Sequence, residues 1–345
     1  MNDLTDRQKL ILTLVVHEYI KSASPIGSQA LVDRFHLEMS SATVRNELAS
    51  LTDLGYLRQP HTSAGRIPTE EGYRYFVGRL LQQSELPDST RRTITHQFYQ
   101  MRNDVEQWMR LSASVLAHQS RSASLVTAPH PETARMKHVE LISTRGRQVL
   151  MVLVMAGGEI HQRLLALNER FAQDYLSMTA NKLTHLFEGK DADTIRSLRA
   201  QLQGLEREAT DWILTEMDQA DTQVAGEVYM DGLSNVLAEP EFLGSETAHR
   251  AIRVLEERSR LQDLLSRTLA TSTSGGIQVL IGGEGNWEEL SQFSIVLARY
   301  GTPGLITGTL GVVGPMRMPY GRAISAIRFL SGLLSDLVSD TLVEN

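Results

Sequence analysis

The segment covering residues 40–69 constrains the fold most, because it joins a helical pattern, a stop signal and a polar loop. Val44, Leu48 and Leu51 recur at positions i, i+4 and i+7, which is the spacing of one buried helical stripe. A serine pair precedes this stripe as a cap, and Gly55 follows it as a C-terminal stop. The sequence therefore predicts a short helix that packs on other helices through a single face.

The opposite face of this helix carries small or hydrogen-bonding side chains: Ala42, Asn46, Ala49 and Ser50, flanked by Thr43 and Arg45. A solvated face usually carries long Lys and Glu side chains, whereas a face that enters a DNA major groove needs small residues and a few donors. Asn pairs bidentately with adenine and Arg with guanine. We therefore expect Thr43, Arg45 and Asn46 to contact base edges. The alternative is an ordinary surface helix of an all-helical domain.

Two further helices are expected upstream, as a DNA-reading helix requires. Thr5 and Gln8 form a capping box that opens a helix reaching about Lys21. A short second helix covers residues 28–35, and a tight turn leads into the third helix, which is helix-turn-helix spacing. In this arrangement we expect four polar side chains to lie near phosphate: Ser28, Gln29, Ser41 and Ser50.

The polar loop after Gly55 has the pattern of a β-hairpin. Residues 56–59 read as a short strand, residues 60–65 as the hairpin tip, and residues 66–67 as a return strand ended by Pro68. A hairpin beside a reading helix makes a winged helix. We expect its polar residues to hold the DNA backbone or the minor groove: His61, Thr62, Ser63 and Arg66.

The charge distribution limits the kind of DNA binding that is possible. The formal net charge is −7, yet residues 1–80 hold nine Lys or Arg and nine Asp or Glu, so the deficit lies in the remainder. Four cations are expected around the DNA surface: Arg45, Arg58, Arg66 and Arg74. So few cations imply modest nonspecific affinity, which favours a dimer that reads a specific site over a DNA-coating protein.

Composition and motifs argue against catalysis and cofactors. There is no cysteine, which excludes disulfides and thiolate chemistry, and the ten histidines form no metal-binding motif. The glycines at 282–285 lack the lysine of a P-loop and the full dinucleotide fingerprint. Arg317 either holds an anion or forms a structural ion pair. With no long apolar run and no signal pattern, we expect a cytoplasmic protein that is not an enzyme.

The rest of the chain mixes helices and strands. Residues 82–90 read as a linker, and a helix seam follows over residues 90–120, expected to pack within its own domain. Strands are predicted at 138–143, 148–155, 160–167, 277–282, 294–300 and 304–310. A proline-free, helix-rich segment at 169–222 interrupts them, and a final core helix covers about 321–341.

These motifs resemble one family closely. Residues 39–55, followed by Gln-Pro-His-Thr-Ser-Ala-Gly-Arg-Ile-Pro at 59–68, look like the heat-inducible transcription repressor family HrcA. The likeness continues through Gly-Tyr-Arg-Tyr at 72–75 and returns at 311–320. Residues 281–286 resemble a glycine-glutamate-asparagine turn of the family with one extra residue, and the central third matches in pattern only.

The resemblance implies an α+β fold with an N-terminal winged helix-turn-helix and a GAF-like domain that carries an inserted helical dimerisation domain. The corresponding boundaries are 1–81 for the winged helix, 82–90 for the linker, 91–168 and 223–345 for the GAF-like domain, and 169–222 for the insert.

The resemblance also implies a function. Such proteins are homodimers that silence chaperone operons at an inverted-repeat operator in double-stranded DNA, and the GroEL chaperonin helps them stay active. The alternative is a metabolite-responsive regulator with a small-molecule site in the GAF-like domain, lined by Trp287, Tyr300 and Tyr320.

Overall fold

The computed structural model describes residues 4–62, 64–81, 85–101, 104–222, 227–242, 253–255, 257–269, 276–282 and 288–343. The chain divides into two compact units. Unit 1 contains residues 1–128, 227–301 and 308–345, and unit 2 contains residues 129–226 and 302–307. The predicted α+β class is confirmed, since helices and antiparallel strands alternate along the chain.

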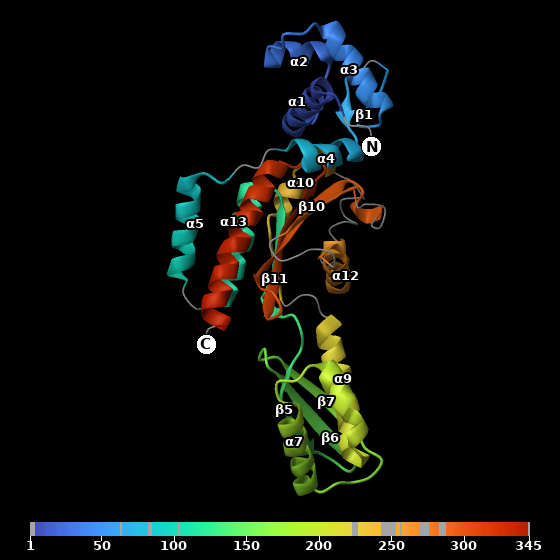
Figure 1. Cartoon of the computed structure of the whole chain (residues 1–345), viewed down its shortest axis with the longest axis vertical. Helices are drawn as coiled ribbons and strands as arrows, with labels where there is room; N and C mark the ends of the chain where they lie inside the picture. The colour runs from blue at the N-terminus through green and yellow to red at the C-terminus, as the bar shows by residue number, and fades with distance from the viewer. Residues whose placement is uncertain are drawn as a thin grey trace. The chain divides into compact units, whose positions relative to one another are not determined.

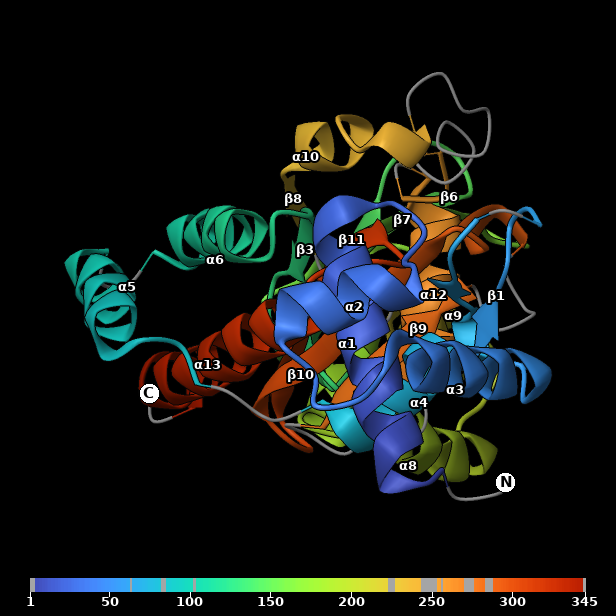
Figure 2. The same ribbon diagram turned by 90° about the horizontal axis from the view of Figure 1, so that it is seen from above.

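Unit 1 begins with a winged helix. Its elements are α1 (Asp6–Ser22), α2 (Ser28–Phe35), α3 (Ser41–Asp53), β1 (Leu57–Arg58), β2 (Ile67–Pro68) and α4 (Glu70–Tyr75), which continues into a π-helical turn (Phe76–Leu80). The predicted capping box is present, because the Thr5 side chain accepts from the Gln8 N–H while the Gln8 side chain accepts from the Thr5 N–H. Figures 1 and 2 show the three blue helices grouped together with β1 beside α3.

The three helices form a small core of their own. Ile11, Leu12 and Val15 of α1 are fully buried, as is Leu31 of α2. Arg34 of α2 forms an ion pair with the buried Glu18 of α1. Apolar packing and this one ion pair therefore fix α1 and α2 as the base on which α3 rests.

The remainder of unit 1, which we call the GAF-like part, is built on a sheet. Its strands are β3 (Ala123–Thr127), β8 (Val228–Asp231), β9 (Ile277–Ile281), β10 (Phe293–Thr302) and β11 (Ile306–Pro315), hydrogen-bonded in the order β8-β3-β11-β10-β9. Numbered along the chain this order is 2-1-5-4-3. The predicted strands at 277, 294 and 304 correspond to β9, β10 and β11, whereas β3 and β8 were missed.

Helices cover both faces of this sheet. They are α5 (Asp88–Gln100), α6 (Val105–Ser120), α10 (Leu233–Leu237), α12 (Arg258–Leu269) and α13 (Tyr320–Val338), with short turns at Pro240–Phe242, Glu288–Leu290 and Ser339–Val343. Helix α6 packs on β3, β8 and α13. In both ribbon views α13 and α12 lie on opposite sides of β10 and β11 (Figures 1 and 2), so residues 293–298 and 307–315 are buried without alternation.

The prediction of a single helix over residues 90–120 is wrong, because this segment forms two helices, α5 and α6. Helix α5 ends at Gln100, and α6 starts at Val105 with Asp104 as its cap, whose carboxylate accepts from the Gln107 N–H at 3.0 Å. The Trp108 indole then donates to the Met101 carbonyl at 2.9 Å. A competing cap and a buried donor therefore break the helix that the apolar spacing predicted.

Unit 2 is a three-stranded antiparallel meander with helices packed on one face. Its elements are β4 (His130–Pro131), β5 (Met136–Ser143), β6 (Gln148–Met155), β7 (Ile160–Ala166), α7 (Gln173–Phe187), α8 (Ala192–Leu198), a turn at Arg199–Gln201, and α9 (Gly204–Thr222). Alternate residues of β5 and β6 enter one core with Leu176, Leu183, Phe187 and Ile213 of the helices.

This division differs from the boundaries drawn from the sequence. The meander was assigned to the GAF-like domain, and only residues 169–222 to the insert. The shared core shows why the strands belong with these helices, because the buried side chains of β5 and β6 have α7 and α9 as their apolar partners.

Side chains of α7 occupy main-chain hydrogen-bonding positions of β5. The Gln173 amide accepts from the Ser143 N–H at 2.8 Å and donates to the Leu141 carbonyl at 3.0 Å. The Thr184 hydroxyl accepts from the Val139 N–H at 3.1 Å. These bonds satisfy main-chain groups that a further strand would otherwise pair.

Gly72 supplies a test of the winged-helix packing. A Cβ at this position would lie 2.1 Å from the Tyr56 carbonyl oxygen, which is main chain and cannot turn away. Gly72→Ala should therefore lower the free energy of unfolding of the winged helix by about 1–3 kcal/mol. Urea unfolding followed by hydrogen exchange at α1 to α3 would measure it.

Gly78 is the matched control, because a Cβ there meets nothing within 4 Å. Gly78→Ala should leave stability unchanged or raise it by roughly 0.5–1 kcal/mol. Equal effects of the two substitutions would contradict the close approach at Tyr56.

Candidate nucleic-acid interface

Helix α3 is held so that one face is buried and the other points outward. Ser40 caps it, with its hydroxyl accepting from the Thr43 N–H at 3.1 Å. Val44, Leu48 and Leu51 are buried against α1 and α2, as predicted. The cap and the stripe together fix both the start of α3 and its rotation about its axis.

The outward face presents the residues expected to read bases. Ala42, Arg45 and Asn46 are exposed, and Thr43 is half-buried with its hydroxyl 3.0 Å from that of Ser40. Within the part of the chain that the structure describes, the side chains of Arg45 and Asn46 form no hydrogen bond and no ion pair. A small residue beside an uncommitted guanidinium and amide is the arrangement that major-groove reading needs.

Two of the residues expected near phosphate are already engaged in the protein. The Ser50 hydroxyl accepts from the Gln8 amide at 3.1 Å, which ties α3 to α1. Gln29 donates to Asp33 at 2.7 Å on the exposed side of α2. Ser28 is buried in the first turn of α2, and Ser41 is half-buried in the first turn of α3.

The tip of the wing is ordered by a residue that the sequence analysis missed. The Gln59 amide donates to the carbonyls of Thr62 and Ala64, both at 2.9 Å. His61 and Thr62 are exposed at this tip, whereas Ser63 lies outside the described residues. Sequence spacing gave no signal for Gln59, because both of its acceptors are main-chain carbonyls.

The base of the wing is joined to the helices through Gly65 and Arg66. Arg66 and Ile26 exchange two main-chain hydrogen bonds of 2.8 and 2.9 Å. A Cβ on Gly65 would lie 2.3 Å from the Ile26 carbonyl carbon, so this approach requires glycine. The Arg66 Nε donates to the Thr52 hydroxyl of α3 at 2.9 Å. Arg66 is thus a wing residue whose side chain attaches the wing to α3.

Two of the four expected DNA-surface cations, Arg58 and Arg74, line a cavity where the winged helix meets the GAF-like part. Arg74 forms ion pairs with Glu70 and Glu71 at 3.1 and 3.2 Å and donates to the Ile281 carbonyl of β9 at 3.0 Å. It therefore links the winged helix to the GAF-like part. Because Arg74 closely follows the wing in sequence, it was expected at the DNA surface. The carboxylates of Glu70 and Glu71 and the Ile281 carbonyl, which is far away in sequence, determine where its guanidinium lies.

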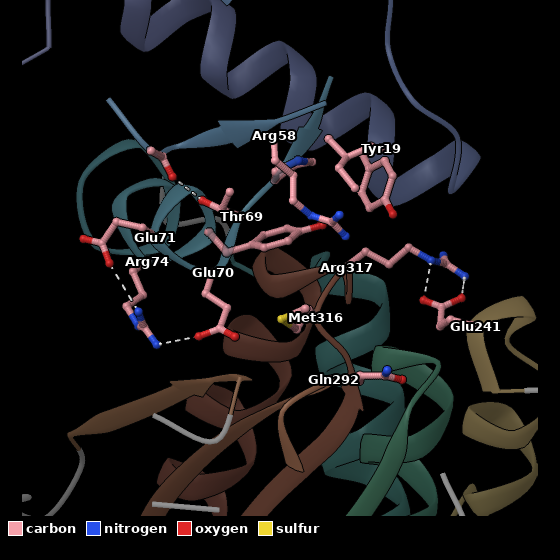
Figure 3. Close-up of a pocket in the computed structure, with 14 residues that line it drawn as sticks. Tyr19, Arg58, Thr69, Glu70, Glu71, Arg74, Glu241, Gln292, Met316 and Arg317 are labelled. Carbon is pink, nitrogen blue, oxygen red and sulfur yellow. Dashed lines mark hydrogen bonds and ion pairs between the residues drawn. The ribbon is translucent and has the colours of Figure 1, made fainter. Parts of the chain in front are cut away.

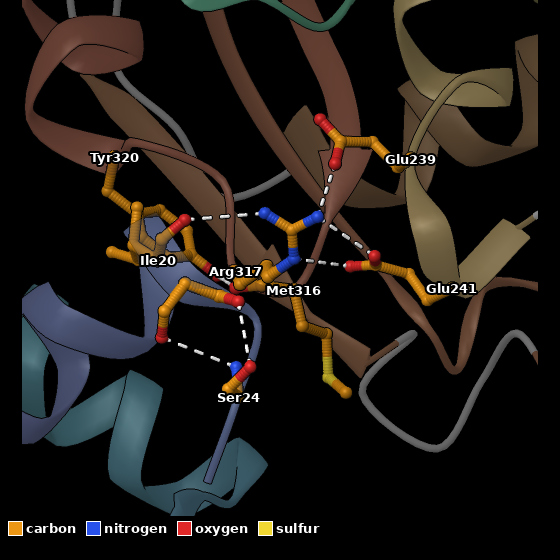
Figure 4. A network of polar contacts seen from close by, with 8 residues as sticks. Ile20, Ser24, Glu239, Glu241, Met316, Arg317 and Tyr320 are labelled. Atoms are coloured by element: carbon orange, nitrogen blue, oxygen red, sulfur yellow. Dashed lines mark hydrogen bonds and ion pairs between the residues drawn. The ribbon is translucent and has the colours of Figure 1, made fainter. Parts of the chain in front are cut away.

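Arg317 makes a second such link. Its guanidinium binds Glu241 through two hydrogen bonds of 2.8 and 2.9 Å, binds Glu239, and donates to the Ile20 carbonyl of α1 at 3.3 Å (Figure 4). Of the two roles expected for Arg317, the structural ion pair is the one observed. The link crosses from the end of β11 to the last turn of the first helix.

A cavity of about 640 Å³ lies between these links (Figure 3). Its guanidinium groups from Arg74 and Arg317 are each matched by carboxylates. The hydroxyl of Tyr73, which also lines it, is buried without a hydrogen-bond partner among the described residues, and burial raises its pKa well above the usual value. This junction is therefore electrically balanced but not fully hydrogen-bonded.

Two of the three aromatic residues expected to line a small-molecule site, Tyr300 and Tyr320, are buried core residues, although Tyr320 also lines a second cavity described below. The Tyr300 hydroxyl donates to the Thr127 carbonyl at 2.6 Å, and the Tyr320 hydroxyl donates to the Met316 carbonyl at 2.7 Å. Both side chains are buried, and burial raises the pKa of each hydroxyl. Trp287 and the turn at 283–286 lie outside the described residues.

Neither metal ligands nor a membrane span is found in the described part of the chain. No group of three or more His, Asp or Glu side chains there is arranged to hold a metal ion. None of the described helices combines the length and apolar character needed to cross a membrane.

A three-helix scaffold, an outward reading face and an ordered wing define a winged-helix DNA-binding protein, here joined to an α+β part. A family model described as the HrcA protein C-terminal domain matches residues 106–324. Proteins named heat-inducible transcription repressor HrcA are 42% identical in Roseiflexus castenholzii and 41% identical in Thermomicrobium roseum. Each match covers 98% of this chain and at least 95% of the relative. The chain belongs to the HrcA family of heat-inducible transcription repressors.

A solved structure supports the fold over the full length. A crystal structure of a hypothetical protein at 2.2 Å resolution aligns with a TM-score of 0.57 and 23% identity, covering 98% of both chains.

Gln59 gives a test of the wing geometry. Gln59→Ala removes both hydrogen bonds at the tip, each worth ~0.5–1.5 kcal/mol, so amide exchange over residues 60–66 should accelerate about tenfold. Hydrogen exchange read by mass spectrometry would measure it, with α3 as the internal reference. Unchanged exchange at the wing would show that Gln59 does not order it.

Proposed function

We propose that this protein is a dimeric repressor that binds an inverted-repeat operator controlling chaperone genes. The observation that carries the proposal is the outward face of α3, where Arg45 and Asn46 are uncommitted beside an ordered wing. Two such faces related by a two-fold axis would enter successive major grooves of one operator.

Each DNA-facing residue has a proposed role. Thr43, Arg45 and Asn46 read base edges. Ser41, together with Ser28 and Gln29 at the start of α2, lies nearer the phosphates. His61, Thr62, Ser63 and Arg66 hold the backbone or the minor groove from the wing. Ser50 acts indirectly, because its hydroxyl is held by Gln8.

Arg45 tests the reading face. Arg45→Ala should cost roughly 1–3 kcal/mol of operator binding and relax specificity at one base pair, whereas Arg66→Ala should weaken all sequences more evenly. Binding of matched and single-mismatch operators at fixed salt would separate the two effects. Arg145→Ala, at the exposed β5–β6 turn of unit 2, is the charge-matched control. Equal discrimination by Arg45→Ala and the native chain would remove Arg45 from the reading face.

The proposed dimer surface is the outer face of the meander, opposite the helices. The strand register places Ile142 beside Leu150 and Leu150 beside Leu164, with Val154 beside Ile160. Ile142, Ile160 and Leu164 are 41%, 61% and 56% exposed. A sheet face that presents several exposed aliphatic side chains is typical of a self-association surface.

Leu164 tests this surface. Leu164→Glu places a charge at the β7 end of the cross-strand row Ile142, Leu150 and Leu164 and should convert the dimer to a monomer at micromolar concentration, measured by light scattering. Leu10→Glu is the matched control, because Leu10 is a similarly exposed leucine on α1 of the winged helix. A Leu164→Glu protein that stays dimeric would move the interface elsewhere.

Modulation by GroEL completes the proposal. If the folded state is only marginally stable, mild heat raises the unfolded fraction several-fold, and a chaperonin would return it to the DNA-binding form. The test is to heat the purified protein briefly with and without GroEL and then measure operator binding. Recovery that is independent of the chaperonin would remove this step.

A further inference from the structure

A second cavity, of about 560 Å³, lies where the winged helix meets the GAF-like part. It is bounded by the last turns of α1, the residue after α6 and the start of α13. Its charged lining is almost entirely basic: His17, Lys21, Arg121, Arg317 and Arg322, with Glu239 as the single carboxylate. This is unusual for a chain whose net charge is −7.

The carboxylates at this cavity compensate the cations only in part, because Glu239 and Glu241 together carry one more charge than the Arg317 that they bind. Glu239 is bound by Arg317, which Glu241 also engages. Within the described part of the chain, Lys21, Arg121 and Arg322 have no ion pair or side-chain hydrogen bond. Three exposed positive charges from three distant segments therefore line one hollow without a protein partner, and a bound anion could contact them without breaking an ion pair.

The electrostatic effect of these charges is visible on a neighbour. Burial and, second to it, the positive charge of Lys21 lower the pKa of His17. The first turn of α13 also lines the cavity and contains no acidic residue. The main-chain N–H groups of this turn are largely hydrogen-bonded within the chain, since Tyr320, Arg322 and Ala323 donate to the carbonyls of Met318 and Pro319. The cavity of Figure 3 differs, since carboxylates match its Arg74 and Arg317.

We propose that this basic cavity binds a small multivalent anion, such as a phosphorylated or polycarboxylate metabolite, through Lys21, Arg121 and Arg322. The volume is in the range of small-molecule sites. Phe76, Leu81 and Pro319 supply an apolar wall for an organic body. A DNA backbone is less suitable, because Lys21, Arg121 and Arg322 lie on elements other than α3 and the wing. Since Lys21 belongs to the winged helix and the two arginines to the GAF-like part, the bound anion joins them.

Calorimetric titration of the full chain with pyrophosphate and with citrate, at constant ionic strength, tests the proposal. At least one of them should bind saturably, while acetate should not. Arg121→Gln and Arg322→Gln should each raise the dissociation constant about tenfold, as expected for one charge-assisted hydrogen bond. Lys21→Gln should do the same from the winged-helix side, and Arg145→Gln, on the other unit, should have no effect.

If pyrophosphate binds more tightly than citrate, the ligand is a phosphorylated compound. If citrate binds more tightly than pyrophosphate, the ligand is a polycarboxylate. Absence of saturable binding by both, or equal affinity in the native chain and in all three cavity variants, overturns the proposal. It is also overturned if the cavity variants lose affinity for a random-sequence duplex while neither anion binds, because that result assigns the cations to DNA phosphate. Circular dichroism of each variant without ligand confirms that it is folded.

Discussion

The packing of α3 on α1 and α2 is the interaction on which the rest of the structure depends. Three buried aliphatic residues, Val44, Leu48 and Leu51, set the rotation of this helix, so Arg45 and Asn46 point away from the protein. The wing is then attached to the same helix through Arg66 and Thr52. A change in that rotation would turn Arg45 and Asn46 inward and displace the wing, because α3 carries both residues and the Thr52 hydroxyl that holds Arg66.

The sequence was most informative where neighbours along the chain determine structure. Caps, apolar periodicity and turn residues located α1 to α3 and most strands within a few residues. It failed where partners are distant. Strand β3 was missed because it is only five residues long and begins with Ala and Ser, which are weak strand formers. The same limit applies to the site: the outward face of α3 follows from its period, but the partners of Ser50 and Arg74 are set by residues that only the fold brings near.

The contacts between the winged helix and the GAF-like part include two arginine-centred polar links beside aromatic and aliphatic contacts. Arg74 and Arg317 each combine ion pairs with a hydrogen bond to a main-chain carbonyl across the junction, and the Tyr73 hydroxyl there has no partner among the described residues. Polar links of this kind are specific in direction but contribute little net stability when water can replace them. A junction built in this way keeps a defined geometry, while little free energy is needed to rearrange it. Such a junction suits a heat-inducible repressor whose winged helix must respond to conditions.

The side chains of Gln173 and Thr184 on the edge of β5 have a consequence for how copies of the chain meet. An unpaired strand edge accepts another strand, and the new edge accepts the next, so association at an edge can grow into open sheets. Occupying the β5 positions with side chains denies that route at this strand. Association through the aliphatic face of the meander, as proposed for the dimer, would close on itself once two copies have met. With the β5 positions occupied, pairing with a further strand is restricted to the β7 edge of the sheet.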